Sequence, residues 1–183
     1  MERAHKPACA LFNTGCHPQI AYGKEGYGAH PSLVSQWRAL ASHAVGGGGG
    51  KCATTLIACR IGEHQDPFLL AVRDQVKMWF YLAAQEPDVV SLTKAWAEAR
   101  RRFLRSGWAA FTGPLGGTIG TLAGIGWEPV GPRIWVNSSG KRWNPEDSAL
   151  HADILADAQR DATQTLWSRA AVHRNGTVSY THL

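Results

Sequence analysis

The sequence predicts a mainly α-helical fold with about five helices, one small β-hairpin at about residues 133–143 and a loop-rich N-terminus. Three observations support this prediction. Apolar residues recur every three or four positions over several long segments, as on the buried face of an α-helix. Asp-Pro and Asn-Pro pairs, which are typical helix starts, precede two of these segments. One segment, RIWVNSSGKRW, has the pattern of two short strands joined by a turn.

Residues 1–50 are predicted to be a loop-rich segment with one helix at about 32–45. The apolar residues of this helix are Leu33, Val34, Trp37, Leu40, Ala41 and Ala44. Five consecutive glycines follow, and they predict a flexible connection because glycine loses much backbone entropy in a helix or strand. A phosphate-binding loop is the alternative. It requires Ser or Thr directly after its lysine, whereas Cys52 follows Lys51.

Residues 51–176 are predicted to be a helical region that contains the hairpin. Its first helix starts at Asp66-Pro67 and stops before Pro87, which breaks the helical pattern. The next helix covers about 88–105. The residues predicted to form its buried face are Val89, Leu92, Trp96, Ala99, Phe103 and Leu104.

The hairpin and the last helix follow from turn and cap residues. Gly140 supplies the positive φ that a four-residue turn needs, and Trp135 and Trp143 then either pair across the two strands or pack on the same helix. Asn144-Pro145 is a typical helix start, so we expect a final helix from there to about His173.

The segment from Ser106 to Pro132 contains Glu128 as its only ionisable side chain. A membrane span is one interpretation, but Pro114 and the many glycines leave few strongly apolar residues. A dinucleotide-binding loop is disfavoured because no strand leads into it and the glycine spacing does not match. We therefore favour a short helix at about 113–123. Its glycine stripe would allow a neighbouring element to approach closely: Gly116, Gly120 and Gly124.

The string GPLGGTIGTLAGIGWEPVGPRIWVNSSGKRWN resembles a segment of the retrotransposon proteins that are abundant in dinoflagellate genomes. In those proteins the segment lies downstream of the reverse transcriptase domain, and the resemblance covers about residues 60–174. It implies that the parent polyprotein performs RNA-directed DNA synthesis. The chain has no Asp-Asp pair, which such polymerases use to bind two magnesium ions. The resemblance therefore implies a non-catalytic connecting or thumb-like region that adjoins other domains of the polyprotein.

The final residues, Val178 to Leu183, resemble a translated sequencing-library adaptor. We expect residues 177–183 to be a non-native or disordered tail. The N-terminus, MERAHKPACALFNTG, has no apolar run of the kind found in secretory signals, so we expect an intracellular protein in the cytoplasm or nucleus. Six residues separate the cysteines in each of the two pairs, which is wider than zinc sites usually have. We expect neither metal nor cofactor.

No catalytic motif is evident, and enzyme activity is not predicted from these residues. His151 with Asp153 or Asp157 has a spacing that can bind metal, but a polar helix face is the favoured interpretation. The net charge of +5 is compatible with nucleic-acid binding. An alternative function is therefore a free-standing basic module that binds RNA or DNA. Its candidate contact residues are Arg100, Arg101, Arg102, Arg105, Lys141 and Arg142.

Overall fold

The computed structural model describes residues 15, 22–46, 53–86, 88–110 and 113–174. Several predictions lie outside the described residues: three of the four cysteines, most of the glycine run with Lys51, and the tail at 177–183. Cys59 is within the described part and is an exposed free thiol.

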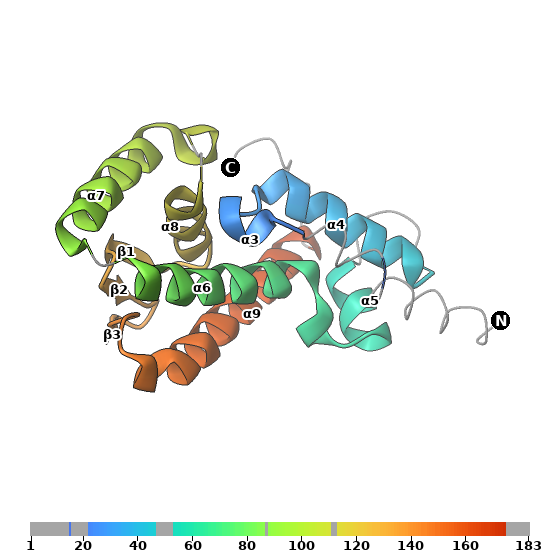
Figure 1. The fold of residues 1–183 in the computed structure, drawn as a ribbon. Coiled ribbons are helices and arrows are strands. Elements are labelled where there is room, and N and C mark those ends of the chain that lie inside the picture. The colour runs from blue at the N-terminus through green and yellow to red at the C-terminus, as the bar shows by residue number, and fades with distance from the viewer. Residues whose placement is uncertain (1–14, 16–21, 47–52, 87, 111–112, 175–183) are drawn as a thin grey trace.

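Helix α6, Pro67–Gln85, is the central element of the fold. It packs against α9 (His151–Arg174), α8 (Pro114–Gly124), α4 (Pro31–Ala44) and the single turn α3 (Lys24–Tyr27). A small antiparallel sheet lies at the C-terminal end of α6 (Figure 1), while α5 (Ala53–Arg60) lies at the opposite end. Helix α7, Val89–Ser106, packs against α8 and the near edge of the sheet. The predicted mainly helical class is confirmed.

Each of the five predicted helices is present, and the helix start predicted at Asp66-Pro67 is confirmed. The Asp66 side chain accepts a hydrogen bond of 2.8 Å from the backbone N–H of Phe68, which caps α6. The last helix begins later than predicted. Asn144 and Asp147 cap a turn and a short 3-10 helix, Ser148–Leu150, so α9 itself starts at His151. Helices α3 and α5 were not predicted, because they are too short to show a periodic pattern.

The sheet has three strands in the order β1–β2–β3: Glu128–Gly131, Ile134–Val136 and Arg142–Trp143. The predicted hairpin corresponds to β2 and β3, in which Trp135 lies opposite Trp143. Gly140 has φ of +83° in the connecting turn, as expected. Strand β1 was missed, because Pro129 with a glycine on either side, Gly126 and Gly131, resembles a loop. It pairs with β2 through a bulge between Pro129 and Gly131.

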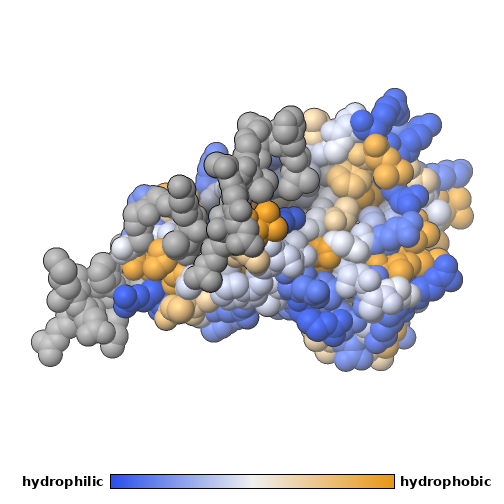
Figure 2. Space-filling model, turned by 180° about the vertical axis from the view of Figure 1, so that it is seen from behind, coloured by the Kyte–Doolittle hydropathy of each residue, from blue (hydrophilic) through white to orange (hydrophobic). Residues whose placement is uncertain are grey.

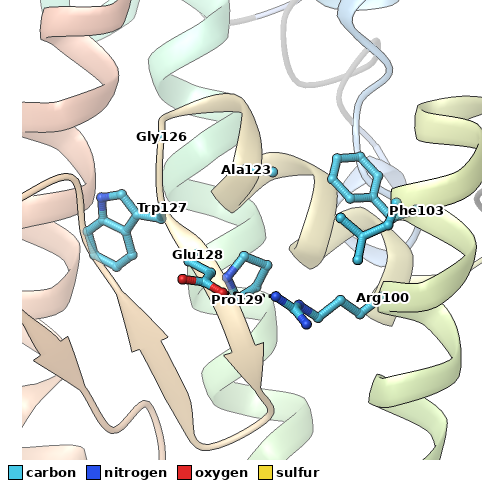
Figure 3. Close-up of a pocket in the computed structure, with 8 residues that line it drawn as sticks. Arg100, Phe103, Ala123, Gly126, Trp127, Glu128 and Pro129 are labelled. Carbon is cyan, nitrogen blue, oxygen red and sulfur yellow. Dashed lines mark hydrogen bonds and ion pairs between the residues drawn. The ribbon is translucent and has the colours of Figure 1, made fainter. Parts of the chain in front are cut away.

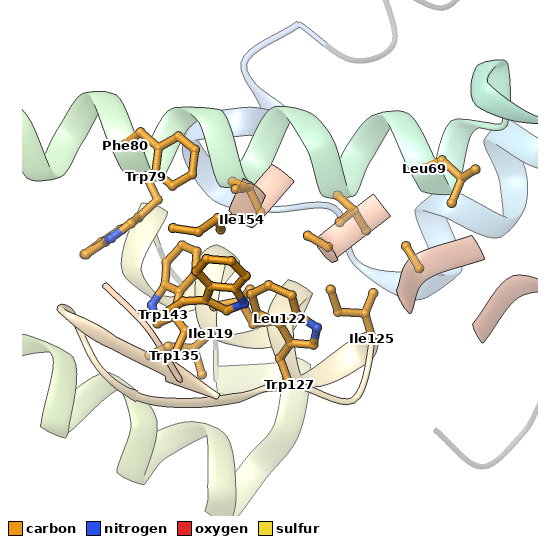
Figure 4. Packing of buried hydrophobic residues seen from close by; sticks show 14 of the residues in the cluster. Leu69, Trp79, Phe80, Ile119, Leu122, Ile125, Trp127, Trp135, Trp143 and Ile154 are labelled. Carbon is orange, nitrogen blue, oxygen red and sulfur yellow. The ribbon is translucent and has the colours of Figure 1, made fainter. Parts of the chain in front are cut away.

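The hydrophobic core lies where α6, α8 and α9 meet the sheet (Figure 4). Five tryptophans occupy it, none more than 4% exposed: Trp79, Trp96, Trp127, Trp135 and Trp143. The rings of Trp79 and Trp96 meet edge to face with centroids 4.7 Å apart, a favourable aromatic geometry. The core therefore joins residues from α6, α7, β2 and β3 with Trp127, which directly precedes β1.

Helix α8 ends through a six-residue C-terminal motif. Gly126 has φ of +81°, and the N–H of Trp127 donates to the carbonyl of Leu122 at 2.9 Å. Of the predicted glycine stripe, Gly116 and Gly120 are buried, whereas Gly124 has open space beside it. An added Cβ on Gly124 would meet nothing within 4 Å, whereas on Gly117 it would lie 2.6 Å from the backbone N of Gly28. Gly117 is thus where α3 packs on α8.

Candidate functional site

Helix α7 carries four of the six basic residues predicted to contact nucleic acid. One set of hydrogen bonds caps its N-terminus, and another hydrogen bond joins it to the sheet. At its N-terminus, Asp88 accepts hydrogen bonds from the N–H groups of Val90 and Ser91, at 3.0 and 3.1 Å. Near its middle, the indole N–H of Trp96 donates to the carbonyl of Pro129 in β1 at 3.1 Å. Trp96 is 1% exposed, so this side of α7 faces the core.

Three of the four arginines of α7 form ion pairs within the chain. Arg100 pairs with Glu128 in β1 at 2.9 Å, and Arg102 pairs with Glu98 at 2.8 Å. Arg101 also pairs with Glu98. Hydrogen bonds from Arg102 and Arg101 hold the pKa of the Glu98 carboxyl below its usual value. Arg101, Arg102 and Glu98 all remain at least a third exposed, so these surface pairs contribute little to stability.

Arg105 is exposed and lies nine residues after Trp96. At 100° per residue it therefore lies on the opposite side of α7 from the core. The four arginines and the two carboxylates that pair with them, Glu98 and Glu128, leave a formal charge of +2 on this surface.

Lys141 and Arg142 do not lie beside the arginines of α7. Helix α7 packs on β1, whereas Lys141 and Arg142 are at β3, the other edge of the sheet. The Nζ of Lys141 is 3.6 Å from the ring centroid of Trp143, a cation–π contact. The structure thus brings together Arg100, Arg101, Arg102 and Arg105 and leaves the other two basic residues separate.

An open hollow of about 290 Å³ lies between α7, the end of α8 and the start of β1 (Figure 3). The Arg100–Glu128 ion pair crosses it, and the indole of Trp127 turns away from it toward α9. Apart from that pair, its lining is mostly apolar: Phe103, Leu104, Ala123, Gly126, Trp127 and Pro129.

Leu104 at the edge of this hollow was predicted to be buried, and that prediction was wrong. It is 71% exposed. Leu104 lies 100° around the helix from Phe103, which is partly buried against the core, so the core covers one residue and leaves its neighbour outside. Leu40, one of the periodic apolar residues of α4, is likewise exposed, by 52%.

A polar cluster that the sequence did not reveal joins the hairpin turn to α9. The buried Asp161 carboxylate accepts from the Trp127 indole N–H at 2.7 Å and from the Ser138 hydroxyl at 2.7 Å. Asp157 accepts from the Asn137 amide at 3.1 Å. The sequence contained one indication of this cluster: the indole N–H of a buried tryptophan such as Trp127 needs a hydrogen-bond acceptor. These contacts fasten the sheet to α9.

His151, considered above as a metal ligand, is engaged elsewhere. Its ring stacks on Phe80 with centroids 3.8 Å apart, and its Nε2 lies 2.9 Å from the Pro145 carbonyl. Asp157 pairs with Arg160 at 2.7 Å. Within the part of the chain that the structure describes, no group of three His, Cys, Asp or Glu side chains has the arrangement to hold a metal ion.

None of the helices formed by the described residues has the length and apolar character to cross a membrane. Comparisons of the chain with protein-family models, with curated proteins and with solved structures found no significant match.

Proposed function

We propose that this chain is a non-catalytic connecting or thumb-like module of a retroelement polyprotein whose reverse transcriptase domain lies upstream. The observation that carries the proposal is the resemblance of the string from Gly113 to Asn144. In the fold this string forms α8 and the sheet, and six of its apolar residues are buried in the core: Ile119, Leu122, Ile125, Trp127, Trp135 and Trp143. The string therefore stabilises the fold of this chain, which supports a structural role for the module.

The continuous reading frame around the coding sequence tests this proposal. We expect a complete transcript to encode, upstream of these residues, a reverse transcriptase domain with its paired aspartates. Long-read sequencing of transcripts that extend through both flanks is the measurement. A complete transcript without a polymerase domain would contradict the proposal.

Nucleic-acid binding is a second candidate function, and one observation favours it. The arginine cluster of α7 keeps a formal charge of +2 after its internal ion pairs are counted. Arg101 and Arg102 are 68% and 57% exposed, so phosphates can reach both side chains. Exchange of a surface ion pair for a phosphate contact costs little, because exposed pairs are weak.

The triple variant Arg101→Ala/Arg102→Ala/Arg105→Ala tests nucleic-acid binding. If these arginines contact phosphates, the slope of log affinity against log salt for single-stranded RNA falls by about two, since each contact contributes roughly 0.7. Fluorescence anisotropy with a labelled oligonucleotide over a salt series gives this slope. The matched control removes the same charge elsewhere: Arg60→Ala/Arg73→Ala/Arg133→Ala. Equal slopes for the two triple variants would rule out a specific role for α7.

A further inference from the structure

Helix α7 carries a second apolar stripe on its outer side. Val90, Ala97 and Leu104 are spaced by seven residues, and all three are exposed, Val90 by 63% and Leu104 by 71%. Residues seven apart drift by only about 20° around an α-helix, so these side chains form one line along it. Single exposed apolar residues are common on protein surfaces. Three that align at a seven-residue spacing match one of the two apolar positions that each heptad of a helix-packing seam contains.

The stripe leads into the hollow, whose lining is apolar apart from the Arg100–Glu128 ion pair. Leu104 belongs to both, and Phe103, Ala123 and Pro129 form neighbouring parts of the wall. Figure 2 shows hydrophobic residues on the surface at the end of the molecule that holds α7 and the sheet, with hydrophilic residues between them. Because the hollow is open and Leu104 lines it, a side chain from outside can enter it while its backbone lies along α7.

Basic side chains flank the stripe at the same spacing. Lys94 and Arg101 are seven residues apart, and each follows an apolar member of the stripe by four residues: Val90 and Ala97. In helix pairs this flanking position carries the charges that select the partner. Lys94 and Arg101 are both exposed, and Arg105 extends the basic row. The complementary partner therefore carries carboxylates.

We propose that the outer side of α7 is a docking site for an acidic amphipathic α-helix of another protein. The apolar face of that helix covers Val90, Ala97 and Leu104, one apolar side chain enters the hollow, and its carboxylates face Lys94 and Arg101. A second copy of α7 would place like charges opposite each other. A nucleic acid would use the arginines but would leave the apolar stripe uncovered. The inference goes beyond the proposed function and does not depend on the polyprotein context.

Binding of a synthetic peptide to the full chain tests this proposal. The probe is a labelled amphipathic helical peptide with leucines on one face and glutamates beside them, and its partner probe has lysines in place of the glutamates. We expect the acidic peptide to bind saturably by anisotropy and the basic one not to bind. Amide NMR shifts of α7 around Leu104 are expected to move. Leu104→Glu is expected to weaken binding by about tenfold or more, as at an interface hot spot.

Two further variants make the test decisive. Val172→Glu places the same charge at an apolar residue of α9 that is 52% exposed, and it is expected to leave binding unchanged. Lys94→Glu/Arg101→Glu is expected to reverse the preference, so that the basic peptide binds instead. The proposal is overturned if Leu104→Glu binds the acidic peptide like the parent chain, or if both peptides bind the parent equally. Binding of an oligothymidine but of neither peptide assigns the surface to nucleic acid instead.

Discussion

Replacing Arg38 with methionine is expected to lower the free energy of unfolding by about 3–5 kcal/mol at neutral pH. The Nε of Arg38 donates to both oxygens of Asp66 at 3.0 Å, and its Nη2 donates to the Thr54 hydroxyl at 2.5 Å. Asp66 is 1% exposed. Loss of the guanidinium therefore leaves a buried carboxylate without its counter-charge. Urea unfolding followed by circular dichroism measures the change.

The pH dependence of this variant follows from the pKa of Asp66. Burial raises that pKa above its unfolded value of 3.8, although the Arg38 guanidinium acts in the opposite direction. The folded state then binds more protons than the unfolded state, so stability falls as the pH rises from 3.8 through the folded pKa. Without Arg38 the pKa rises further. The loss caused by Arg38→Met should therefore be largest above that pKa and shrink in acid.

A double variant separates charge from helix capping. Asn also caps helices, so Arg38→Met/Asp66→Asn keeps the cap of α6 and removes the buried charge. We expect it to be more stable than Arg38→Met alone at neutral pH. If Arg38→Met lowers the free energy of unfolding by less than about 1 kcal/mol, the Arg38–Asp66 pair behaves like an exposed ion pair. That result would contradict a buried ion pair at this position.

Replacing Gly117 with alanine is expected to destabilise the fold by about 1–3 kcal/mol, as overpacking does. The added Cβ would lie 2.6 Å from the N and 2.7 Å from the Cα of Gly28, and 2.8 Å from the carbonyl carbon of Tyr27. These are backbone atoms, so α3 or α8 has to move. Thermal unfolding of the variant measures the cost.

Gly124 on the same helix is the matched control. A Cβ there meets nothing within 4 Å, so Gly124→Ala should stabilise the protein by up to about 1 kcal/mol through helix propensity alone. If Gly117→Ala stabilised the protein equally, the contact between α3 and α8 would not form in solution.

The sequence predicted the helices well because their starts and stops depend on neighbouring residues. Asp66 and Asp88 cap the helices that follow them, and Gly140 takes the positive φ that its turn needs. Strand β1 was missed, because a strand containing Pro129 is recognisable only once β2 lies beside it. From the sequence, the arginines of α7 and the basic residues of the hairpin were predicted to form one contact surface. The strand order puts them at opposite edges of the sheet.

The sequence by itself determined much of the local structure: the five longest helices, the position of the hairpin turn and which residues are apolar. The tertiary structure decided which distant residues form hydrogen bonds and ion pairs with one another. The indole of Trp127 donates a hydrogen bond to Asp161, 34 residues away, and that of Trp96 donates to Pro129, 33 residues away. Arg100 forms an ion pair with Glu128. It also decided that Leu104 stays outside. Periodicity shows that a helix has an apolar face, but the width of that face that becomes buried depends on the elements that pack against it.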